Sequence, residues 1–262
     1  MKICIPTYNR THILKERSLK FLESYNVDKN IIDIFVGTEE EKIEYQKVIG
    51  DYNFIIHGQI GMGPVRNFIR HHYKYNTEER YVLCMDDDIE KLTTITSDIT
   101  DFEGYCMSMF KFAEDKSLCF WGICPFDNTF WLRDSISVNN RYICGGFHGI
   151  VIRRDRHDIY TDLDHGEDIQ FTLEHFLRDG GVVRDNRYGL KTDYYSTDGG
   201  MHDINGGTKK RLLEQHEASM YIKERYGDMV ELKKQEKLKK KKLPGDLDWV
   251  YNIKFNYRYK NI

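Results

Sequence analysis

Three consecutive aspartates, Asp86, Asp87 and Asp88, come directly after the apolar residues 81–85. The apolar run predicts a buried strand, and ligands of an open α/β sheet bind beyond the carboxyl ends of its strands. Carboxylate oxygens at this spacing suit Mg²⁺ or Mn²⁺, which usually keep water and substrate phosphates as their other ligands. The sequence therefore indicates a hard-cation site, and a solvated acidic turn is the competing interpretation.

A second acidic cluster, residues 162–168, precedes the amphipathic stretch 169–178. The spacing of Phe171, Leu173 and Phe176 predicts a helix there with one apolar face. Glu167 and Asp168 then lie at its N-terminus, where the helix dipole stabilises ionised carboxylates. The pair could serve as a structural cap or in chemistry.

Two glycine-rich segments accompany the acidic clusters. Residues 58–64 contain three glycines and open a predicted helix over 65–75, which lets backbone approach a ligand closely. This loop has neither the lysine of a P-loop nor the glycine spacing of a dinucleotide fingerprint. Residues 196–207 are turn-forming throughout and predict a mobile lid. The lid carries His202, which is either an exposed loop histidine or a metal ligand.

The order of the predicted elements brings several turns to one edge of a sheet. Strands are expected at residues 2–5, 30–36, 53–57 and 81–85. The helices between them are expected at residues 12–25, 39–49 and 65–75. This alternation predicts a doubly wound, mainly parallel α/β sheet. The turns at 6–10 and 37–38 should therefore meet the aspartates in one crevice.

The second half of the chain is less regular. Helices are expected at 101–116 and 211–226, and strands at 118–125, 182–183 and 188–196. Residues 126–140 are predicted to be a loop. The apolar region 141–153 is interrupted by Gly145 and Gly146, and glycines inside a strand pattern often mark a bulge or the close approach of a ligand.

Composition excludes a membrane-spanning chain and a disulfide scaffold. The 262 residues contain no apolar run near the roughly 20 needed to cross a bilayer, and the N-terminus does not read as a signal peptide. The six cysteines lack paired metal spacing, so they are predicted to be reduced and buried in a cytoplasmic protein. They are Cys4, Cys84, Cys106, Cys119, Cys124 and Cys144.

Charge is distributed unevenly along the chain. Residues 232–262 hold ten Lys or Arg against three Asp or Glu, a net charge of +7, which leaves −10 for residues 1–231 because the whole chain carries −3. We therefore expect a domain over 1–231 and a basic, aromatic tail over 232–262. The tail indicates either a polyanionic partner, such as DNA or a membrane surface, or a solvated lysine-rich helix.

Four short motifs, in this order, resemble the nucleotide-sugar domain of GT-A glycosyltransferases. They are IPTYNR at 5–10, Gly37-Thr38, GPVRN at 63–67 and MDDD at 85–88. The resemblance covers about residues 1–207. It implies a GT-A-like fold with a nucleotide-sugar half over 1–100 and an acceptor half over 101–231. It further implies a UDP-sugar donor and Mn²⁺ or Mg²⁺.

The same resemblance implies roles for individual residues. Asp88, Asp86 and His202 would bind the metal. Asp168 would act as the general base, with Glu167 orienting sugar hydroxyls. The residues expected to hold the nucleotide sugar are Pro6, Thr7, Tyr8, Arg10, Gly37, Thr38, Gly63, Arg66, Asp86 and Asp87.

A narrower set of motifs is similar to the TET-associated glycosyltransferases, a largely bacteriophage family related to the base J glucosyltransferase. These motifs include GGFHGIVIRRD at 145–155 and HGEDIQF at 165–171. The similarity implies transfer to the hydroxymethyl group of 5-hydroxymethylpyrimidine in DNA. An extruded base would then stack on aromatic side chains, for which the candidates are Trp121, Phe130, Trp131 and Phe147, each of which also suits the core. The lysine-rich tail would contact phosphates.

Two other functions are compatible with the sequence. A GT-A enzyme could glycosylate a polysaccharide, lipid or protein, and its sugar transfer would be indifferent to DNA. A non-enzymatic DNA-binding protein would show neither metal-dependent nucleotide binding nor any activity for Asp88→Ala to abolish. Two separated acidic motifs and a glycine-rich lid favour an enzyme.

Overall fold

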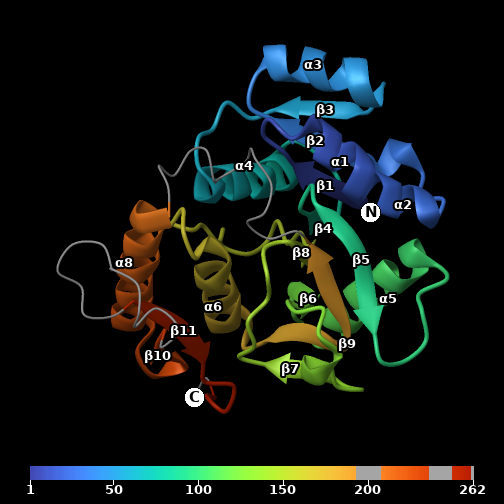
Figure 1. Ribbon diagram of the computed structural model, residues 1–262. Coiled ribbons are helices and arrows are strands. Elements are labelled where there is room, and N and C mark those ends of the chain that lie inside the picture. The colour runs from blue at the N-terminus through green and yellow to red at the C-terminus, as the bar shows by residue number, and fades with distance from the viewer. Residues whose placement is uncertain (193–207, 236–249, 261–262) are drawn as a thin grey trace.

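The computed structural model describes residues 1–192, 208–235 and 250–260 of the chain (Figure 1). A nine-stranded sheet forms its centre, with strand order β3-β2-β1-β4-β8-β6-β9-β5 and with β7 paired to β9. Helices cover both faces of this sheet (Figure 1). The expected α/β fold is confirmed.

The first half of the sheet is parallel, as the sequence predicts. Its strands are β1 (Lys2–Pro6), β2 (Ile32–Val36), β3 (Asn53–Ile56) and β4 (Tyr81–Met85). The helices that connect them include α3 (Glu39–Ile49) and α4 (Met62–Tyr75). The connection after β1 is one helical run in three parts, α1 (Thr11–Leu14), the π-helical η1 (Lys15–Leu19) and α2 (Lys20–Ser24). Parallel strands buried on both faces explain the continuous apolar runs.

The second half of the sheet contains mixed pairings. β8 (Phe147–Val151) is antiparallel to β4 and to β6 (Phe120–Cys124). β6 is parallel to β9 (Val182–Thr192), which also pairs with β5 (Ile89–Thr94) and β7 (Ile136–Asn139). The helices of this half are α5 (Phe102–Asp115) and α6 (Glu167–Asp179).

Three expected elements differ from those observed. The segment after the aspartates forms β5, whose mostly polar sequence gives little strand signal. The predicted loop over 126–140 contains a 3₁₀ turn, η3 (Thr129–Trp131), and the strand β7. The two short strands expected at 182–183 and 188–196 are one strand, β9, whose polar residues 184–187 interrupt the apolar pattern.

Two apolar clusters lie on the two faces of the sheet. One includes Trp121 and Phe147, and the other includes Phe120 and Phe171. Trp121 and Phe147 are fully buried, so of the two roles considered for them they take the one in the core and do not stack on a substrate base. Phe130 and Trp131 are exposed by 68% and 54%, which leaves only these two of the four candidates able to contact a substrate. All six cysteines are free and buried, as expected.

The C-terminal part packs against the domain. After α8 (Thr208–Tyr226) and η4 (Gly227–Met229), the strands β10 (Val230–Lys234) and β11 (Tyr251–Phe255) form an antiparallel pair. Ile253, Phe255 and Tyr259 pack against the cluster that holds Ile222 and Tyr226. α8, β10 and β11 lie together beside α6 (Figure 1). β10 thus crosses the boundary expected at residue 231.

None of the helices in the described part of the chain is long and apolar enough to cross a membrane.

Candidate active site

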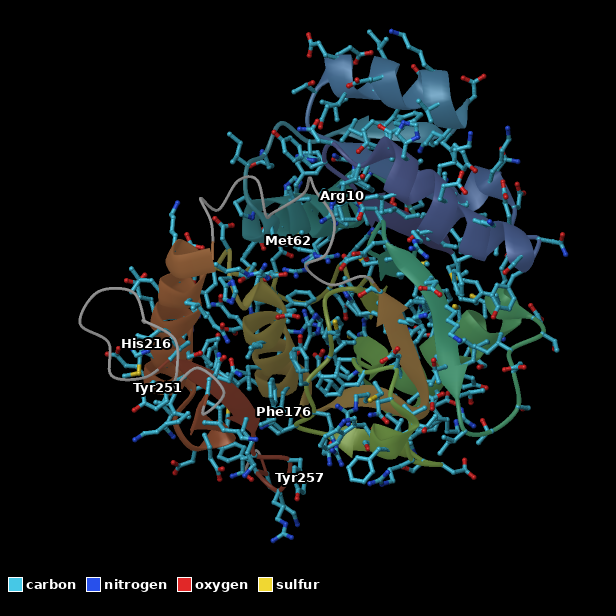
Figure 2. The ribbon with its side chains drawn as sticks, in the orientation of Figure 1. Arg10, Met62, Phe176, His216, Tyr251 and Tyr257 are labelled. Carbon is cyan, nitrogen blue, oxygen red and sulfur yellow. The ribbon has the colours of Figure 1, made fainter. Side chains whose placement is uncertain are left out.

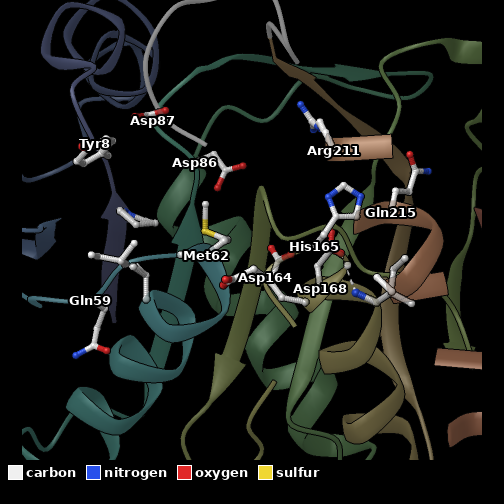
Figure 3. Close-up of a pocket in the computed structure, with 18 of the residues that line it drawn as sticks. Tyr8, Gln59, Met62, Asp86, Asp87, Asp164, His165, Asp168, Arg211 and Gln215 are labelled. Carbon is white, nitrogen blue, oxygen red and sulfur yellow. Dashed lines mark hydrogen bonds between the residues drawn. The ribbon is translucent and has the colours of Figure 1, made fainter. Parts of the chain in front are cut away.

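A cavity of about 550 Å³ joins the two halves of the molecule (Figure 3). On one wall lie Tyr8, Asp86 and Asp87, and on the other lie Arg211 and Gln215 (Figure 3). The turns after β1 and β4 meet here because both strands end at the same edge of the sheet. The predicted crevice is therefore present. The predicted site residues that line it are Pro6, Thr7, Tyr8, Arg10, Asp86, Asp87, Asp88, Glu167 and Asp168.

The aspartate turn is held by a buried serine from the π-helical segment. Ser18 Oγ donates to the carbonyl oxygen of Asp86 (2.7 Å) and accepts from the backbone N–H of Ile89 (2.9 Å). The backbone N–H of Asp86 donates to the carbonyl oxygen of Gly146 (2.9 Å). π-helical turns are frequent at functional sites, and this one brings Ser18 under the turn.

Asp87 and Asp88 are buried acids with a limited supply of cations. Thr7 Oγ1 donates to Asp87 (2.7 Å), and Arg10 Nη1 lies 3.4 Å from Asp87 and 3.8 Å from Asp88. Burial raises the pKa of Asp87 to about 6. Burial, together with the charges of Asp86 and Asp87, raises the pKa of Asp88 to about 7. The protein's own cations therefore compensate these carboxylates only in part.

One atom of this turn has no hydrogen-bond donor among the described residues. Asp88 Oδ1 is buried and accepts no hydrogen bond from residues 1–192, 208–235 or 250–260. A buried carboxylate oxygen without a donor is costly, and coordination of a hard cation would remove that cost. Asp86, whose side chain is 28% exposed, offers a second carboxylate in the same turn. The described residues contain no group of three or more metal-ligating side chains, and His202 lies outside them.

Arg66 joins the two acidic motifs. Its buried guanidinium forms an ion pair with Asp86 (2.7 Å). A Cβ built on Gly145 would lie 3.3 Å from Arg66 Nη2 and 3.5 Å from Glu167 Oε1, and one built on Gly146 would lie 2.9 Å from Asp86 Oδ2. The glycine pair therefore lets both acidic motifs and Arg66 approach one point, as glycines inside a strand pattern predict.

The second acidic motif opens α6, as predicted. Asp168 Oδ2 accepts from the hydroxyl of Tyr142 and from the backbone N–H of Gly145 (3.1 Å), and Oδ1 accepts from the N–H of Ile169 (2.8 Å). Burial and the charge of Asp168 raise the pKa of Glu167 to about 8, against the opposing charge of Arg66. Burial thus favours the protonated form of Glu167, whereas Asp168 accepts hydrogen bonds from three donors.

Three expected nucleotide ligands make contacts within the protein. The N–H of Gly37 donates to Glu41 Oε2 (2.7 Å), and Thr38 Oγ1 caps α3 by accepting from the N–H of Glu41 (3.2 Å). The N–H of Gly63 donates to Asp164 Oδ1 (3.1 Å), so the glycine-rich loop approaches the second acidic cluster. Arg66, a fourth expected ligand, is buried and pairs with Asp86. These four residues are not among those that line the cavity, and their contact with a nucleotide stays a prediction.

Several residues of the cavity wall were not identified from the sequence. Tyr142 contacts Asp168, and Arg211, Gln215 and Asn252 form the wall contributed by α8 and β11. Their positions depend on how α8 and β11 dock beside α6, which no local pattern encodes. The mixed aromatic and basic character of residues 249–260 was the only sequence signal for part of this wall.

No protein-family model matches the chain, and a search of curated proteins gives no match. Solved structures do match. Glucosyl-3-phosphoglycerate synthase from Mycobacterium tuberculosis, in complex with Mn²⁺, UDP-glucose and phosphoglyceric acid, has a TM-score of 0.53 at 11% identity, over 95% of this chain and 88% of that chain. A second crystal structure of the same synthase has a TM-score of 0.51 at 10% identity, over 88% of this chain and 84% of that chain.

The chain has a GT-A fold. Residues 1–349 of S. aureus TarS match as well, at 15% identity and a TM-score of 0.49, over 85% of this chain and 66% of that chain. The chain thus spans just under two thirds of the TarS fragment. At these identities the likeness shows a shared fold, and the reaction has to be argued from the site's own residues.

Proposed function

We propose that this protein is a divalent-metal-dependent glycosyltransferase that moves a sugar from a UDP-sugar to the hydroxymethyl group of a 5-hydroxymethylpyrimidine in DNA. One observation supports the transferase assignment above all. In a GT-A fold, two acidic motifs, residues 86–88 and 167–168, line the same cavity and approach each other near Gly145 and Gly146. One motif suits a cation and the other suits proton transfer, and both reach the same space.

The donor would bind at the wall formed by the turns after β1 and β4. Tyr8 is 41% exposed and lines the cavity, so its ring is available to stack on a nucleobase. Asp86 and Asp88 would hold Mg²⁺ or Mn²⁺, with His202 proposed as a further ligand. A bound divalent cation acts as a Lewis acid that neutralises the charge developing on the leaving diphosphate.

The acceptor hydroxyl would be activated by Asp168. This carboxylate takes the hydroxyl proton while the acceptor oxygen bonds to the anomeric carbon and the bond to the diphosphate breaks. Tyr142 and the N–H of Gly145 fix the orientation of Asp168. Glu167 keeps a proton because its pKa is raised to about 8, first by burial, and it can donate that proton in a hydrogen bond to a sugar hydroxyl.

The DNA acceptor rests on the motif resemblance and on the basic C-terminal part. Phe130 and Trp131 are exposed aromatic rings that contact each other at 5.2 Å between centroids. Such rings suit a nucleobase that has been extruded from a duplex. A polysaccharide, lipid or protein acceptor is the alternative that the same transferase site would serve.

Nucleotide release from a panel of UDP-sugars tests both parts of this proposal, the transferase activity and the DNA acceptor. The full-length protein is assayed with Mn²⁺ or Mg²⁺, with and without DNA containing 5-hydroxymethylcytosine or 5-hydroxymethyluracil, and the DNA is then weighed by mass spectrometry. Release stimulated by modified DNA, with a matching gain of sugar mass, is the expected result. Metal-dependent release that is unaffected by DNA would indicate a polysaccharide, lipid or protein acceptor.

Two variants separate the roles within the site. Asp88→Asn should abolish metal-dependent UDP binding, measured by titration. Asp168→Asn should retain UDP binding and lose sugar transfer, because it removes only the base. Asp155→Asn, which changes an exposed aspartate paired with Arg153, is the matched control and should behave as wild type. Equal activity of all three variants would refute the assignment of the site.

A further inference from the structure

Three arginines from distant parts of the chain gather outside the cavity. The guanidinium carbon of Arg141 lies 4.9 Å from the ring centroid of Tyr257, and that of Arg258 lies 6.0 Å from the same centroid. Arg184, on β9, donates from Nη1 to the carbonyl oxygen of Tyr142 (3.4 Å), the residue that follows Arg141. In Figure 2, Tyr257 lies at the end of the molecule opposite Arg10 and Met62, which line the cavity.

These three arginines have no acidic partner in the part of the chain that the structure describes. Their contacts there are with the amide of Asn186, the carbonyl of Tyr142 and the ring of Tyr257. Arg141 Nε is buried and donates to no acceptor in the structure. Several other arginines pair with carboxylates, such as Arg153 with Asp155 (2.8 Å), whereas Arg133 and Arg154 bond to carbonyl oxygens.

The proximity of Arg141 to the buried Arg184 is electrostatically unfavourable without an anion. Burial lowers the pKa of Arg184 to about 10, and the nearby charge of Arg141 acts in the same direction. Like charges at short range destabilise each other, most strongly where water is partly excluded. An anion between the guanidinium groups would turn this repulsion into attraction and supply acceptors for their N–H donors.

We infer that Arg141, Arg184 and Arg258 form a binding site for a phosphate group. Guanidinium groups bind phosphate oxygens through pairs of parallel hydrogen bonds, and a phosphate offers more acceptor oxygens to several guanidinium groups than a carboxylate does. Tyr257 is 46% exposed and Arg258 is exposed, so this side of the site faces solvent. None of the three arginines lines the cavity, which makes this site independent of the proposed sugar transfer.

Titration calorimetry with inorganic phosphate tests the site directly. The full-length protein is titrated at low ionic strength without divalent metal, as wild type, Arg141→Gln and Arg258→Gln. Each variant should bind phosphate about tenfold more weakly or worse, because a hydrogen-bonded charge pair is lost. Arg153→Gln, at an arginine that has a carboxylate partner, should bind phosphate as wild type does.

Two results would overturn the inference. If the wild-type protein binds no phosphate, the site does not exist. If Arg141→Gln and Arg258→Gln bind phosphate as tightly as wild type does, the phosphate binds elsewhere, for example in the cavity. Thermal unfolding of each variant confirms that it is folded, and Arg258 is an exposed position near the C-terminus where substitution leaves the core untouched. Sugar transfer is not measured, so failure of the proposed function would not affect this result.

A second titration identifies the source of the phosphate. Wild type and Arg258→Gln are titrated with single-stranded oligodeoxythymidylate over a range of salt concentrations. Weaker binding with a shallower salt dependence in the variant assigns the site to the phosphodiester of a nucleic acid. Unchanged oligonucleotide binding, together with weakened phosphate binding, assigns it to a small phosphate ester.

Discussion

Replacing Ser18 with alanine should destabilise the protein and weaken cation binding at the proposed metal site. The side chain of Ser18 is fully buried, and its hydroxyl bonds both the carbonyl oxygen of Asp86 and the N–H of Ile89. Alanine leaves these two backbone groups without a partner. Each buried polar group that loses its partner costs about 1–3 kcal/mol. Partial relaxation reduces the sum, so we expect a loss of about 2–4 kcal/mol in the free energy of unfolding.

Urea denaturation of wild type and Ser18→Ala, without divalent metal, measures this loss. Ser108→Ala is the matched control, because Ser108 Oγ donates to the carbonyl of Tyr105 (2.7 Å) on the exposed side of α5. Its effect should stay within about 0.5 kcal/mol. Mn²⁺ affinity, measured in the same samples, should fall for Ser18→Ala only. A loss below about 1 kcal/mol, or equal losses in the two variants, would refute the role assigned to Ser18.

Three further predictions follow from burial and charge. Because burial raises the pKa of Asp87 to about 6 and of Asp88 to about 7, the native state binds more protons than the unfolded state between about pH 4 and 7. The metal-free protein should therefore lose stability as pH rises through this window, and urea titrations should show a smaller loss for Asp88→Asn. Removal of residues 250–262 should lower the melting temperature and the rate of nucleotide release, because β11 contributes to the cavity wall and the core. A truncated protein with unchanged release would contradict this. Alanine at Phe130 or Trp131 should leave the melting temperature unchanged, since both rings are exposed, and should weaken binding of DNA only if these rings contact bases.

The first half of the fold could be predicted closely from the sequence. The bounds of α3, Glu39–Ile49, coincide with the prediction, and the predicted strands overlap β1 to β4. Each element there is long, strongly apolar or bounded by turn residues, so local pattern and tertiary structure agree. The convergence of the turn at 6–10 with the aspartates followed from the parallel order of the strands alone.

The second half of the fold could be predicted less well because its strands form by pairing with residues that are distant in the sequence. β5 reads Ile-Glu-Lys-Leu-Thr-Thr, and it is a strand because it pairs with β9, about 100 residues later in the chain. β7 pairs with the start of β9 and has no fully buried residue. Such strands carry neither a continuous apolar run nor a clear alternation, so their sequence does not distinguish them from loops.

The C-terminal part of the chain also contributes to the site through long-range packing that its local sequence does not indicate. From the sequence, residues 232–262 are a basic tail that could act on DNA without affecting the donor site. The structure places Asn252 and Ile253 in the cavity wall and packs the ring of Phe255 against that of Tyr142 (5.7 Å), which in turn donates to Asp168. The composition of this segment gives its charge but not how it packs, so its contact with Tyr142, and through Tyr142 with the proposed base, could not be predicted.

The distribution of cations around the aspartate turn supports the proposal that a divalent metal binds there. Arg66 forms an ion pair with Asp86 (2.7 Å), and Arg10 lies nearer to Asp87 than to Asp88. Asp88 is left with the more distant contact, an oxygen without a donor and a pKa raised by burial to about 7. Another arginine at this point would satisfy the carboxylate but would also occupy the space that a diphosphate needs. A small divalent cation would satisfy Asp88 and still offer positions to phosphate oxygens, so the incomplete compensation of Asp88 by nearby arginines is consistent with the proposed nucleotide-sugar site.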